Sequence, residues 1–283
     1  MDNLSIGVIG VSKMGSAIVE TLLDHDYALN IWNRDLNKCK KFEQNTVQIK
    51  ESALDVILKS NLIFFIIDKF SSIKDILTNA ENLKGKVVVN CTTITPLETQ
   101  ALRELIEDKE GKLINTVIGN FPRQIGTDEA YIKCAGDPES WEKYSNIIKI
   151  LSPGSVLLST KPEYVNVLDA ISVGIYQIAI VNFFEAVQLA EKYDISATEL
   201  QSMVSRLWPV INQQLEIYSK EYVTNNYFES EAKLSTFAAS VDTFIDTYEQ
   251  VGVTPNLLSS LKTIMQSMVD QHKGNYSISG IFK

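Results

Sequence analysis

The stretch that decides the fold lies near the start of the chain and reads Ser5-Ile6-Gly7-Val8-Ile9-Gly10-Val11-Ser12-Lys13-Met14-Gly15. Residues 5–9 form a short apolar run typical of a buried strand, and a helical pattern follows from Ser16 to Leu23. Gly10 and Gly15 have the spacing of a strand–turn–helix motif that binds the pyrophosphate of a dinucleotide. We expect Gly10 to permit the sharp turn and Gly15 to let the helix pack close to the sheet.

The turn offers several contacts to a pyrophosphate. The backbone N–H groups at the start of the helix, around Lys13, Met14 and Gly15, point at the ligand, and the helix dipole favours an anion there. Ser12 replaces the second glycine of the motif, which crowds the backbone against phosphate but adds a hydroxyl donor. A purely structural strand-to-helix turn is the alternative, because one glycine motif is weak evidence.

The end of the second predicted strand, residues 28–32, indicates which dinucleotide binds. Asn33 stands where an acid would bind the ribose hydroxyls of NAD. Arg34 and Lys38 follow, and their positive charges suit a 2′-phosphate, which favours NADPH. Asp35 argues against this preference unless its carboxylate points away from the phosphate. A solvated helix start is the alternative explanation for both cations.

Apolar β-type runs and helical segments alternate over the first half of the chain. This alternation predicts a mostly parallel sheet with helices on both faces. After Pro162 no strand pattern appears, and residues 164–193 form a long, mostly apolar helical segment. We therefore predict an N-terminal α/β domain over residues 1–160 and an all-α domain over residues 161–283, joined by a helix at about 163–193. The expected strands cover residues 5–9, 28–32, 62–67, 87–90, 113–117, 130–134 and 155–158, and the later helices cover 197–220, 233–251 and 255–273.

Composition excludes several classes of function. The 283 residues include 26 Lys+Arg and 35 Asp+Glu, and the net charge of −9 argues against nucleic-acid binding. Three scattered cysteines, Cys39, Cys91 and Cys134, suit neither a disulfide framework nor a zinc cluster, and they fit a reducing cytosol. The two histidines have no partners at ligand spacing. We expect a cytoplasmic protein that binds no metal.

The most apolar stretch, residues 170–184, runs for 15 residues without a charge. A bilayer span needs about 20 residues, so we expect a buried helix and no membrane association. A helix that is apolar on nearly all sides must be covered all round, which favours a dimer.

Six motifs in order along the chain carry a family resemblance. They are the Gly-x-x-x-Met-Gly opening at residues 10–15, the Trp-Asn-Arg run at 32–34, Asn-Cys-Thr-Thr-Ile-Thr-Pro at 90–96, Ile-Gly-Thr-Asp-Glu-Ala at 125–130, Leu-Asp at 168–169 and the tail from His272. Over nearly its whole length the chain thus resembles the imine reductase branch of the β-hydroxyacid dehydrogenase superfamily, to which 6-phosphogluconate dehydrogenase is related. The resemblance implies an N-terminal Rossmann domain, a long interdomain helix and a C-terminal helical bundle. It also implies a domain-swapped homodimer whose active site lies between one subunit's Rossmann domain and the other's bundle.

The resemblance also points to the catalytic residue. β-Hydroxyacid dehydrogenases carry a catalytic lysine on the interdomain helix, whereas imine reductases hold an Asp or Tyr at that position, and the alignment places Asp169 there. Residues 162–191 contain no lysine. A carboxyl among apolar neighbours has a raised pKa and either donates a proton to the imine or stabilises the iminium as an anion. The alternative is a solvent-facing acid near the start of the helix.

Five further residues are weaker candidates. Thr92 and Thr93 close a predicted strand at its carboxyl end, where doubly wound sheets bind ligands, so they are candidates for contact with nicotinamide or substrate. Capping of the helix at Pro96 is the alternative role. Tyr176, two turns after Asp169, is a candidate wall of the substrate pocket. Trp208 and Phe237 are further candidates, which the partner subunit would donate in the dimer that the resemblance implies. Core packing is the commoner role for such aromatic side chains.

The sequence thus predicts an NADPH-dependent oxidoreductase that reduces the C=N bonds of cyclic imines to amines. One alternative is a β-hydroxyacid dehydrogenase-like carbonyl or alcohol oxidoreductase, against which the missing lysine counts. The other is a non-catalytic NADP-binding sensor, to which Ser12 and Asp35 lend weight.

Overall fold

The computed structural model describes residues 4–228 and 232–283. The chain forms two compact units, residues 1–174 and 175–283. The division between them falls inside one helix, α7 (Tyr164–Glu191), whose bounds differ from the expected 163–193 by no more than two residues. A domain boundary at residue 160 stays a prediction.

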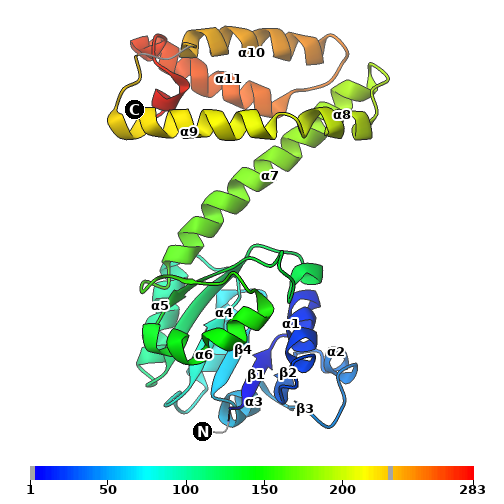
Figure 1. The fold of residues 1–283 in the computed structure, drawn as a ribbon, viewed down its shortest axis with the longest axis vertical. Helices are drawn as coiled ribbons and strands as arrows, with labels where there is room; N and C mark the ends of the chain where they lie inside the picture. Colours follow the sequence, from blue (N-terminus) through cyan, green and yellow to red (C-terminus); the bar gives the residue numbers. More distant parts are fainter. Residues whose placement is uncertain (1–3, 229–231) are drawn as a thin grey trace. The chain divides into compact units, whose positions relative to one another are not determined.

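The first unit is built on an eight-stranded sheet with the order β3-β2-β1-β4-β5-β6-β7-β8 (Figure 1). Every neighbouring pair is parallel except β6 and β7, which confirms the expected mostly parallel sheet. The three-residue strand β3 was not expected, because so short a segment gives no apolar run to recognise. The strands are β1 (Ile6–Ile9), β2 (Leu29–Trp32), β3 (Val47–Ile49), β4 (Leu62–Phe65), β5 (Val87–Asn90), β6 (Lys112–Ile118), β7 (Ile132–Gly136) and β8 (Leu157–Ser159).

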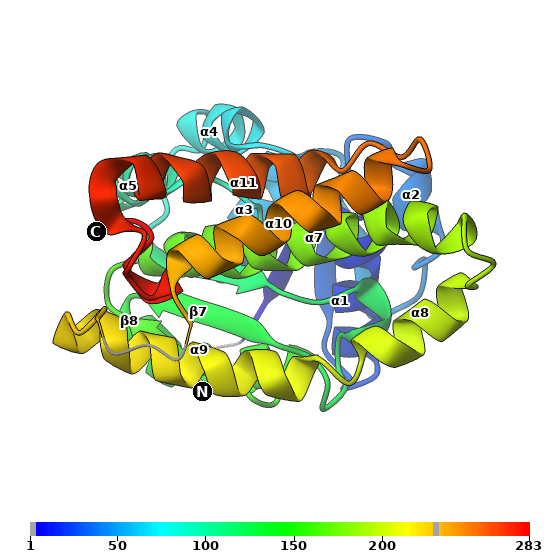
Figure 2. The same ribbon diagram turned by 90° about the horizontal axis from the view of Figure 1, so that it is seen from above.

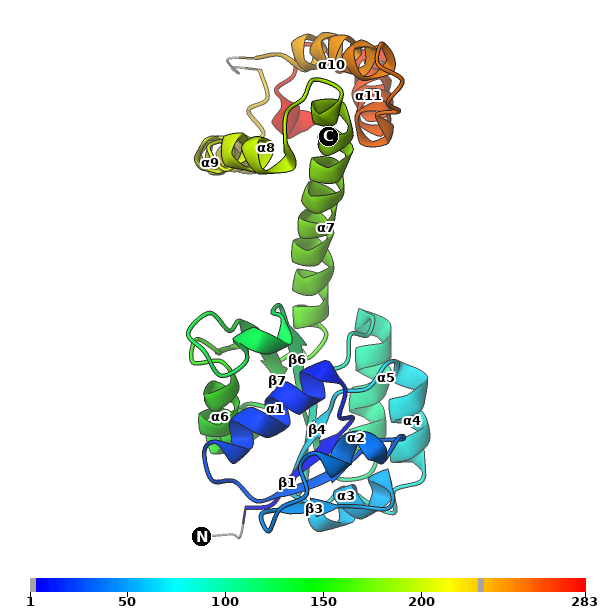
Figure 3. The ribbon, with the colours of Figure 1, turned by 90° about the vertical axis from the view of Figure 1, so that its right-hand side faces the viewer.

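Helices cover both faces of this sheet, as Figure 3 shows edge-on. On one face, α1 (Lys13–Leu23) and α6 (Pro138–Leu151) bury Ile18 and Ile148 in an apolar cluster. On the other, α3 (Ala53–Lys59), α4 (Phe70–Thr78) and α5 (Pro96–Glu107) bury Ile73 and Leu102 in a second cluster. A short helix, α2 (Asn37–Lys40), follows β2. This unit therefore completes its own core.

The second unit contains the rest of α7 and four further helices, α8 (Ala197–Val204), α9 (Trp208–Thr224), α10 (Leu234–Glu249) and α11 (Asn256–Met268). Helices α10 and α11 lie side by side (Figure 2) and enclose a small apolar cluster. Short 3₁₀ or π turns occupy Val269–Lys273 and Ile278–Gly280 in this unit. A 3₁₀ turn at Pro122–Gln124 belongs to the first unit.

Glu185 ties α7 to α11 inside the second unit. Its buried carboxylate accepts hydrogen bonds from the backbone N–H groups of Asn256 at 3.0 Å and Leu257 at 3.1 Å. These are the first N–H groups of α11, which have no partner within the helix, and a negative charge there also favours the helix dipole. The carboxylate therefore fixes where α11 begins.

The expected single helix over residues 197–220 is wrong, because the chain breaks between α8 and α9. Pro209 lies in the first turn of α9. Proline lacks a backbone N–H and its ring clashes with the carbonyl four residues earlier, so a helix begins near it more readily than it passes through.

The middle of α7 lies exposed in the single chain. Ile175 and Phe184 are 66% and 60% exposed. One chain alone does not bury this helix, and its burial by a second copy stays a prediction. Within the described ranges α7 is the one helix that length and composition would allow to cross a membrane.

Candidate active site

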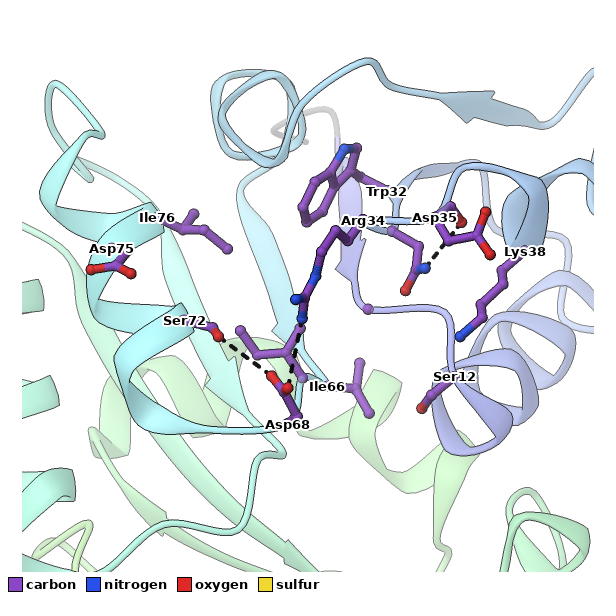
Figure 4. Close-up of a pocket in the computed structure, with 13 residues that line it drawn as sticks. Ser12, Trp32, Arg34, Asp35, Lys38, Ile66, Asp68, Ser72, Asp75 and Ile76 are labelled. Atoms are coloured by element: carbon purple, nitrogen blue, oxygen red, sulfur yellow. Dashed lines mark hydrogen bonds and ion pairs between the residues drawn. The ribbon is translucent and has the colours of Figure 1, made fainter.

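A cleft of about 710 Å³ opens beside the ends of β1, β2 and β4 (Figure 4). The strand order reverses between β1 and β4, and doubly wound sheets bind ligands outside the carboxyl ends of their strands at such a point. Of the predicted cofactor-binding residues, Gly10, Ser12, Asn33, Arg34 and Lys38 line this cleft. The structure thus brings together residues from two separate parts of the sequence.

The two glycines of the turn have no room for a side chain. Gly10 has a φ of 106°, and a Cβ there would lie 2.0 Å from the carbonyl oxygen of Ile66. A Cβ on Gly15 would lie 1.9 Å from the carbonyl oxygen of Gly10. The turn therefore packs backbone directly against backbone, as expected for a helix held close to the sheet.

The start of α1 faces the cleft with open donors. Ser12 is the N-cap residue, yet its exposed side chain makes no capping hydrogen bond to the helix. Lys13 is exposed, whereas Met14 packs against the core of the first unit. The backbone N–H groups and the Ser12 hydroxyl are the groups that suit an anion here.

Asn33 holds the turn in place. Its Oδ1 accepts a hydrogen bond from the backbone N–H of Val11 at 3.0 Å, and its Nδ2 donates to the backbone carbonyl of Asp35 at 3.0 Å. The carboxylate of Asp35 accepts from the N–H of Asn37 at 3.1 Å, at the start of α2. Both side chains thus have roles in the protein itself, so Asp35 argues less strongly against a bound phosphate.

Arg34 spans the cleft to Asp68, as Figure 4 shows, with 3.6 Å between Nη2 and Oδ2. The side chains are 79% and 60% exposed, so water screens this pair and it contributes little. Lys38 lies on the opposite side of the cleft, toward Ser12. Asp68 was not among the predicted site residues, although an acid shortly after a buried strand was a signal for this edge of the sheet.

The two threonines after β5 differ in role. Thr92 is buried, and its hydroxyl accepts a hydrogen bond from the N–H of Ile67 at 3.2 Å. Thr93 is exposed. Neither caps α5, because Thr95 does so in a capping box with Glu98. Thr92 thus joins the loops after β4 and β5.

A buried polar network fixes the first turn of α7 to the sheet. Asn90 donates to Asn115 at 2.7 Å, and Asn115 donates to the Oδ1 of Asn166 at 2.7 Å. The Thr99 hydroxyl also donates to this oxygen at 2.8 Å, and the Asn166 amide donates to the carbonyl of Ile94 at 2.9 Å. A satisfied buried network of this kind enforces one arrangement.

Asp169 follows this anchor by three residues and is partly buried. Burial raises the pKa of its carboxyl, and the nearby Lys133 ammonium acts in the opposite direction. Lys133 comes from β7, and its Nζ donates a hydrogen bond to Ser172 at 3.0 Å. The sequence of α7 alone does not reveal this lysine, because it comes from a strand. A charged residue within an apolar strand was the available signal.

The three aromatic candidates all lie in the second unit. Tyr176 and Trp208 are about half exposed, so core packing is wrong for them within one chain. Phe237 packs against the α10–α11 cluster and also lines an apolar groove of about 970 Å³ beside α9. Their place in a substrate pocket stays a prediction.

The cysteine thiols are not poised for chemistry. Burial raises the pKa of Cys91 to about 12 and raises those of Cys39 and Cys134 as well, so all three stay protonated at neutral pH. Over residues 4–228 and 232–283 no group of three or more His, Cys, Asp or Glu side chains is placed to hold a metal ion.

Comparison with known proteins covers nearly the whole chain. An NADPH-dependent reductive aminase from Aspergillus oryzae is 22% identical over 290 residues, which cover 98% of this chain and 96% of that protein. The cytokine-like nuclear factor N-PAC of Drosophila melanogaster is 23% identical over 69% of this chain, which spans about a third of that protein's length.

Solved structures share the fold. An imine reductase from Pseudomonas sp. superposes with a TM-score of 0.93 at 19% identity, covering 99% of both chains. A reductive aminase from Aspergillus terreus, solved with NADPH and ethyl levulinate, superposes with a TM-score of 0.91 at 20% identity, covering 99% of this chain and 98% of that one.

Two family models account for almost every residue. Residues 5–159 match the NAD-binding domain of 6-phosphogluconate dehydrogenase. Residues 162–283 match the C-terminal domain of the NADPH-dependent reductive aminase-like type. With both matches in order along the chain, the chain belongs to the imine reductase family.

Proposed function

We propose that this protein is an NADPH-dependent reductase that converts the C=N bonds of cyclic imines to amines. The observation that carries the proposal is the position of the Asp169 carboxyl, one turn beyond the polar network that anchors α7 to the sheet. Burial raises the pKa of this carboxyl. Family membership over residues 162–283 supports the same reaction.

The cleft suits NADPH. The N-terminus of α1 and the hydroxyl of Ser12 would hold the pyrophosphate, while Arg34 and Lys38 would meet the 2′-phosphate. Because the ion pair between Arg34 and Asp68 is exposed and weak, a phosphate displaces the carboxylate at little cost. When bound, NADPH supplies the hydride.

The reaction adds a hydride to the imine carbon and a proton to the nitrogen, while NADPH becomes NADP⁺. Asp169 acts at the imine nitrogen. It either donates the proton or, as a carboxylate, stabilises the positive charge of the iminium. Desolvation favours both roles, because it raises the pKa of the carboxyl and strengthens the attraction of the carboxylate for a cation. Thr93 and Tyr176 remain candidates for contact with the substrate.

We further propose a cytoplasmic, domain-swapped homodimer in which the helical unit of one copy completes the active site of the other. The exposed apolar residues of α7 and α9 support an association, and a second copy offers the same apolar surface. In this arrangement the partner's bundle would supply Trp208 and Phe237 to the pocket.

The test uses Asp169→Ala and Asp169→Asn. NADPH consumption with 2-methyl-1-pyrroline should fall by about 10²–10⁴-fold in kcat, because the nitrogen loses its acid or counter-ion. Binding of NADPH should stay unchanged. Glu191→Gln, an exposed acid on the same helix, is the matched control and should retain activity. Wild-type turnover in both Asp169 variants would show that the assignment is wrong.

A further inference from the structure

Lys133 lies near Asp169 and carries a charge that the proposed reaction does not use. In the antiparallel pairing of β6 and β7 it lies opposite Val117. Val117, Ala135 and Val165 form a small buried cluster, so the first turn of α7 covers this face of the sheet. Lys133 therefore belongs to the sheet face against which α7 begins.

The facing side of α7 carries Asp169. Val165, Asp169 and Ser172 are spaced by four and three residues and so share one face of the helix. The Nζ of Lys133 reaches the Ser172 hydroxyl at 3.0 Å, and that hydroxyl donates to the carbonyl of Leu168 at 2.8 Å. Beta-strand and helix thus bring a cation and an anion to the same place.

The ammonium has spare donors. Lys133 is only 8% exposed, and its Nζ ends at Ser172, an exposed residue, so the charge lies at the rim of the buried layer. Its three N–H groups meet one hydrogen-bond acceptor among the described residues, besides the ring of Tyr131 at 5.2 Å. No carboxylate of the described chain forms an ion pair with it within 4.0 Å. A nearly buried ammonium with unused donors is unfavourable unless a bound ligand accepts hydrogen bonds from it.

A substrate with two charges would satisfy both groups. An iminium with no other charged group would contact Asp169 alone. An iminium that bears a carboxylate next to its C=N bond would also contact the Lys133 ammonium. Cyclic imino acids, and imines formed from 2-oxo acids and amines, have this arrangement. The opposite order of charges would place like against like and lose affinity.

We propose that Lys133 selects imines carrying a carboxylate beside the C=N bond, and binds that carboxylate while Asp169 meets the iminium nitrogen. This proposal rests on the proposed imine reduction. It makes Lys133 a determinant of substrate specificity, on an element distant in sequence from α7.

The experiment compares two substrates that differ in one group, 1-pyrroline-2-carboxylate and 2-methyl-1-pyrroline. Each is reduced with NADPH by the wild type, Lys133→Met, Lys133→Arg and the control Lys149→Met, an exposed lysine on α6. We expect the wild type to prefer the carboxylate. Lys133→Met should lower kcat/KM for the carboxylate by about 10–100-fold, the value of a charge-assisted hydrogen bond, and change it less than about 3-fold for the methyl compound. Lys133→Arg should keep part of the preference.

The outcomes separate the two proposals. If the wild type reduces neither compound, the proposed function fails. If it reduces the methyl compound without any preference for the carboxylate, the proposal for Lys133 alone fails. An equal loss on both substrates would make Lys133 a residue that positions Asp169, which also overturns the proposal.

A wild-type measurement protects the test against a variant that does not fold. Proline and pyrrolidine differ in the same carboxylate, and both are tested as inhibitors of 2-methyl-1-pyrroline reduction. The inhibition constant of proline should be at least about 10-fold lower than that of pyrrolidine, since the carboxylate of proline adds a charge-assisted hydrogen bond. Equal inhibition by the two would contradict a carboxylate site.

Discussion

The two units of the chain differ in how they bury their apolar residues. In the first unit, side chains such as Phe64, Phe65 and Ile18 are almost completely buried between the sheet and its helices. In the second, Ile178, Val223 and Phe228 are mostly exposed, and the described core is a small cluster between α10 and α11.

The difference follows from architecture. A sheet with helices on both faces leaves no apolar face open, so the first unit needs nothing further. A set of helices that are apolar on several sides needs more neighbours than this chain supplies. Cofactor binding should therefore tolerate changes that abolish association, whereas turnover should not.

The largest expected effect comes from charging the apolar side of α9 with Ile211→Glu and Leu215→Glu. Both side chains are exposed in one chain, and each buried glutamate in a dimer would cost on the order of 1–3 kcal/mol. The dimer dissociation constant should rise by about 1,000-fold or more, since two copies contribute four charges. Analytical ultracentrifugation measures it, and turnover of 2-methyl-1-pyrroline should fall with it while NADPH still binds.

Gln213→Glu is the control for this change, because Gln213 is exposed on the opposite side of α9. It adds the same charge and should leave association intact. If the Ile211→Glu and Leu215→Glu double variant remains dimeric and active, the second unit does not bury this side of α9 against a second copy, which would contradict the comparison of the two units.

The next effect concerns the cofactor cleft of the first unit. Arg34→Ala should weaken NADPH binding by about 10–100-fold and leave NADH binding nearly unchanged, because the lost bonds are to the 2′-phosphate. Asp68→Asn should strengthen NADPH binding by no more than about 5-fold, since it removes an exposed competitor for Arg34. Fluorescence titration measures both. An equal loss for NADPH and NADH in Arg34→Ala would place the phosphate elsewhere.

A smaller effect is a shift in the pH profile. Burial raises the pKa of Asp169, and the positive charge of Lys133 counteracts this rise. Lys133→Met should therefore raise the pKa further and move the Asp169 limb of the kcat profile to higher pH. With Asp169 as proton donor, activity falls as pH rises through that limb; with Asp169 as anion, it falls as pH drops. Lys149→Met should leave the limb at the same pH. An unchanged limb in Lys133→Met would show that the charge of Lys133 does not influence the titration of Asp169.

The last effect tests the second unit from within. Glu185→Gln keeps the shape of the side chain but replaces one acceptor oxygen with a donor at the start of α11. The free energy of unfolding should fall by about 1–3 kcal/mol, as for a buried charged hydrogen bond. Calorimetry measures the loss, and unchanged stability would mean that the cap contributes nothing.

Local patterns predicted most of the first unit. The glycine turn, seven of the eight strands and the mostly parallel sheet follow from short-range periodicity and from the steric demands of Gly10 and Gly15. The break at Pro209 was missed, because the apolar spacing continues across it while the backbone does not.

The candidate site was less predictable, because its contacts join distant segments. Lys133 and Ser172 are 39 residues apart, and Asn115 and Asn166 are 51 apart. Periodicity along one element says nothing of which polar side chains meet across two. The absence of lysine from residues 162–191 was correct, yet a strand supplies one to the same helix face.

The anchored asparagine network sets the rotational phase of the helix that carries Asp169. An α-helix turns about 100° per residue, so one alanine inserted between Asn166 and Asp169 would swing the carboxyl away from Lys133 without altering a single original side chain. Inserting it before the anchor, in the loop ahead of α7, would leave that angle almost unchanged. The two residues between the anchor and the acid, Val167 and Leu168, thus set the direction in which the carboxyl points, and their number matters more than their identity.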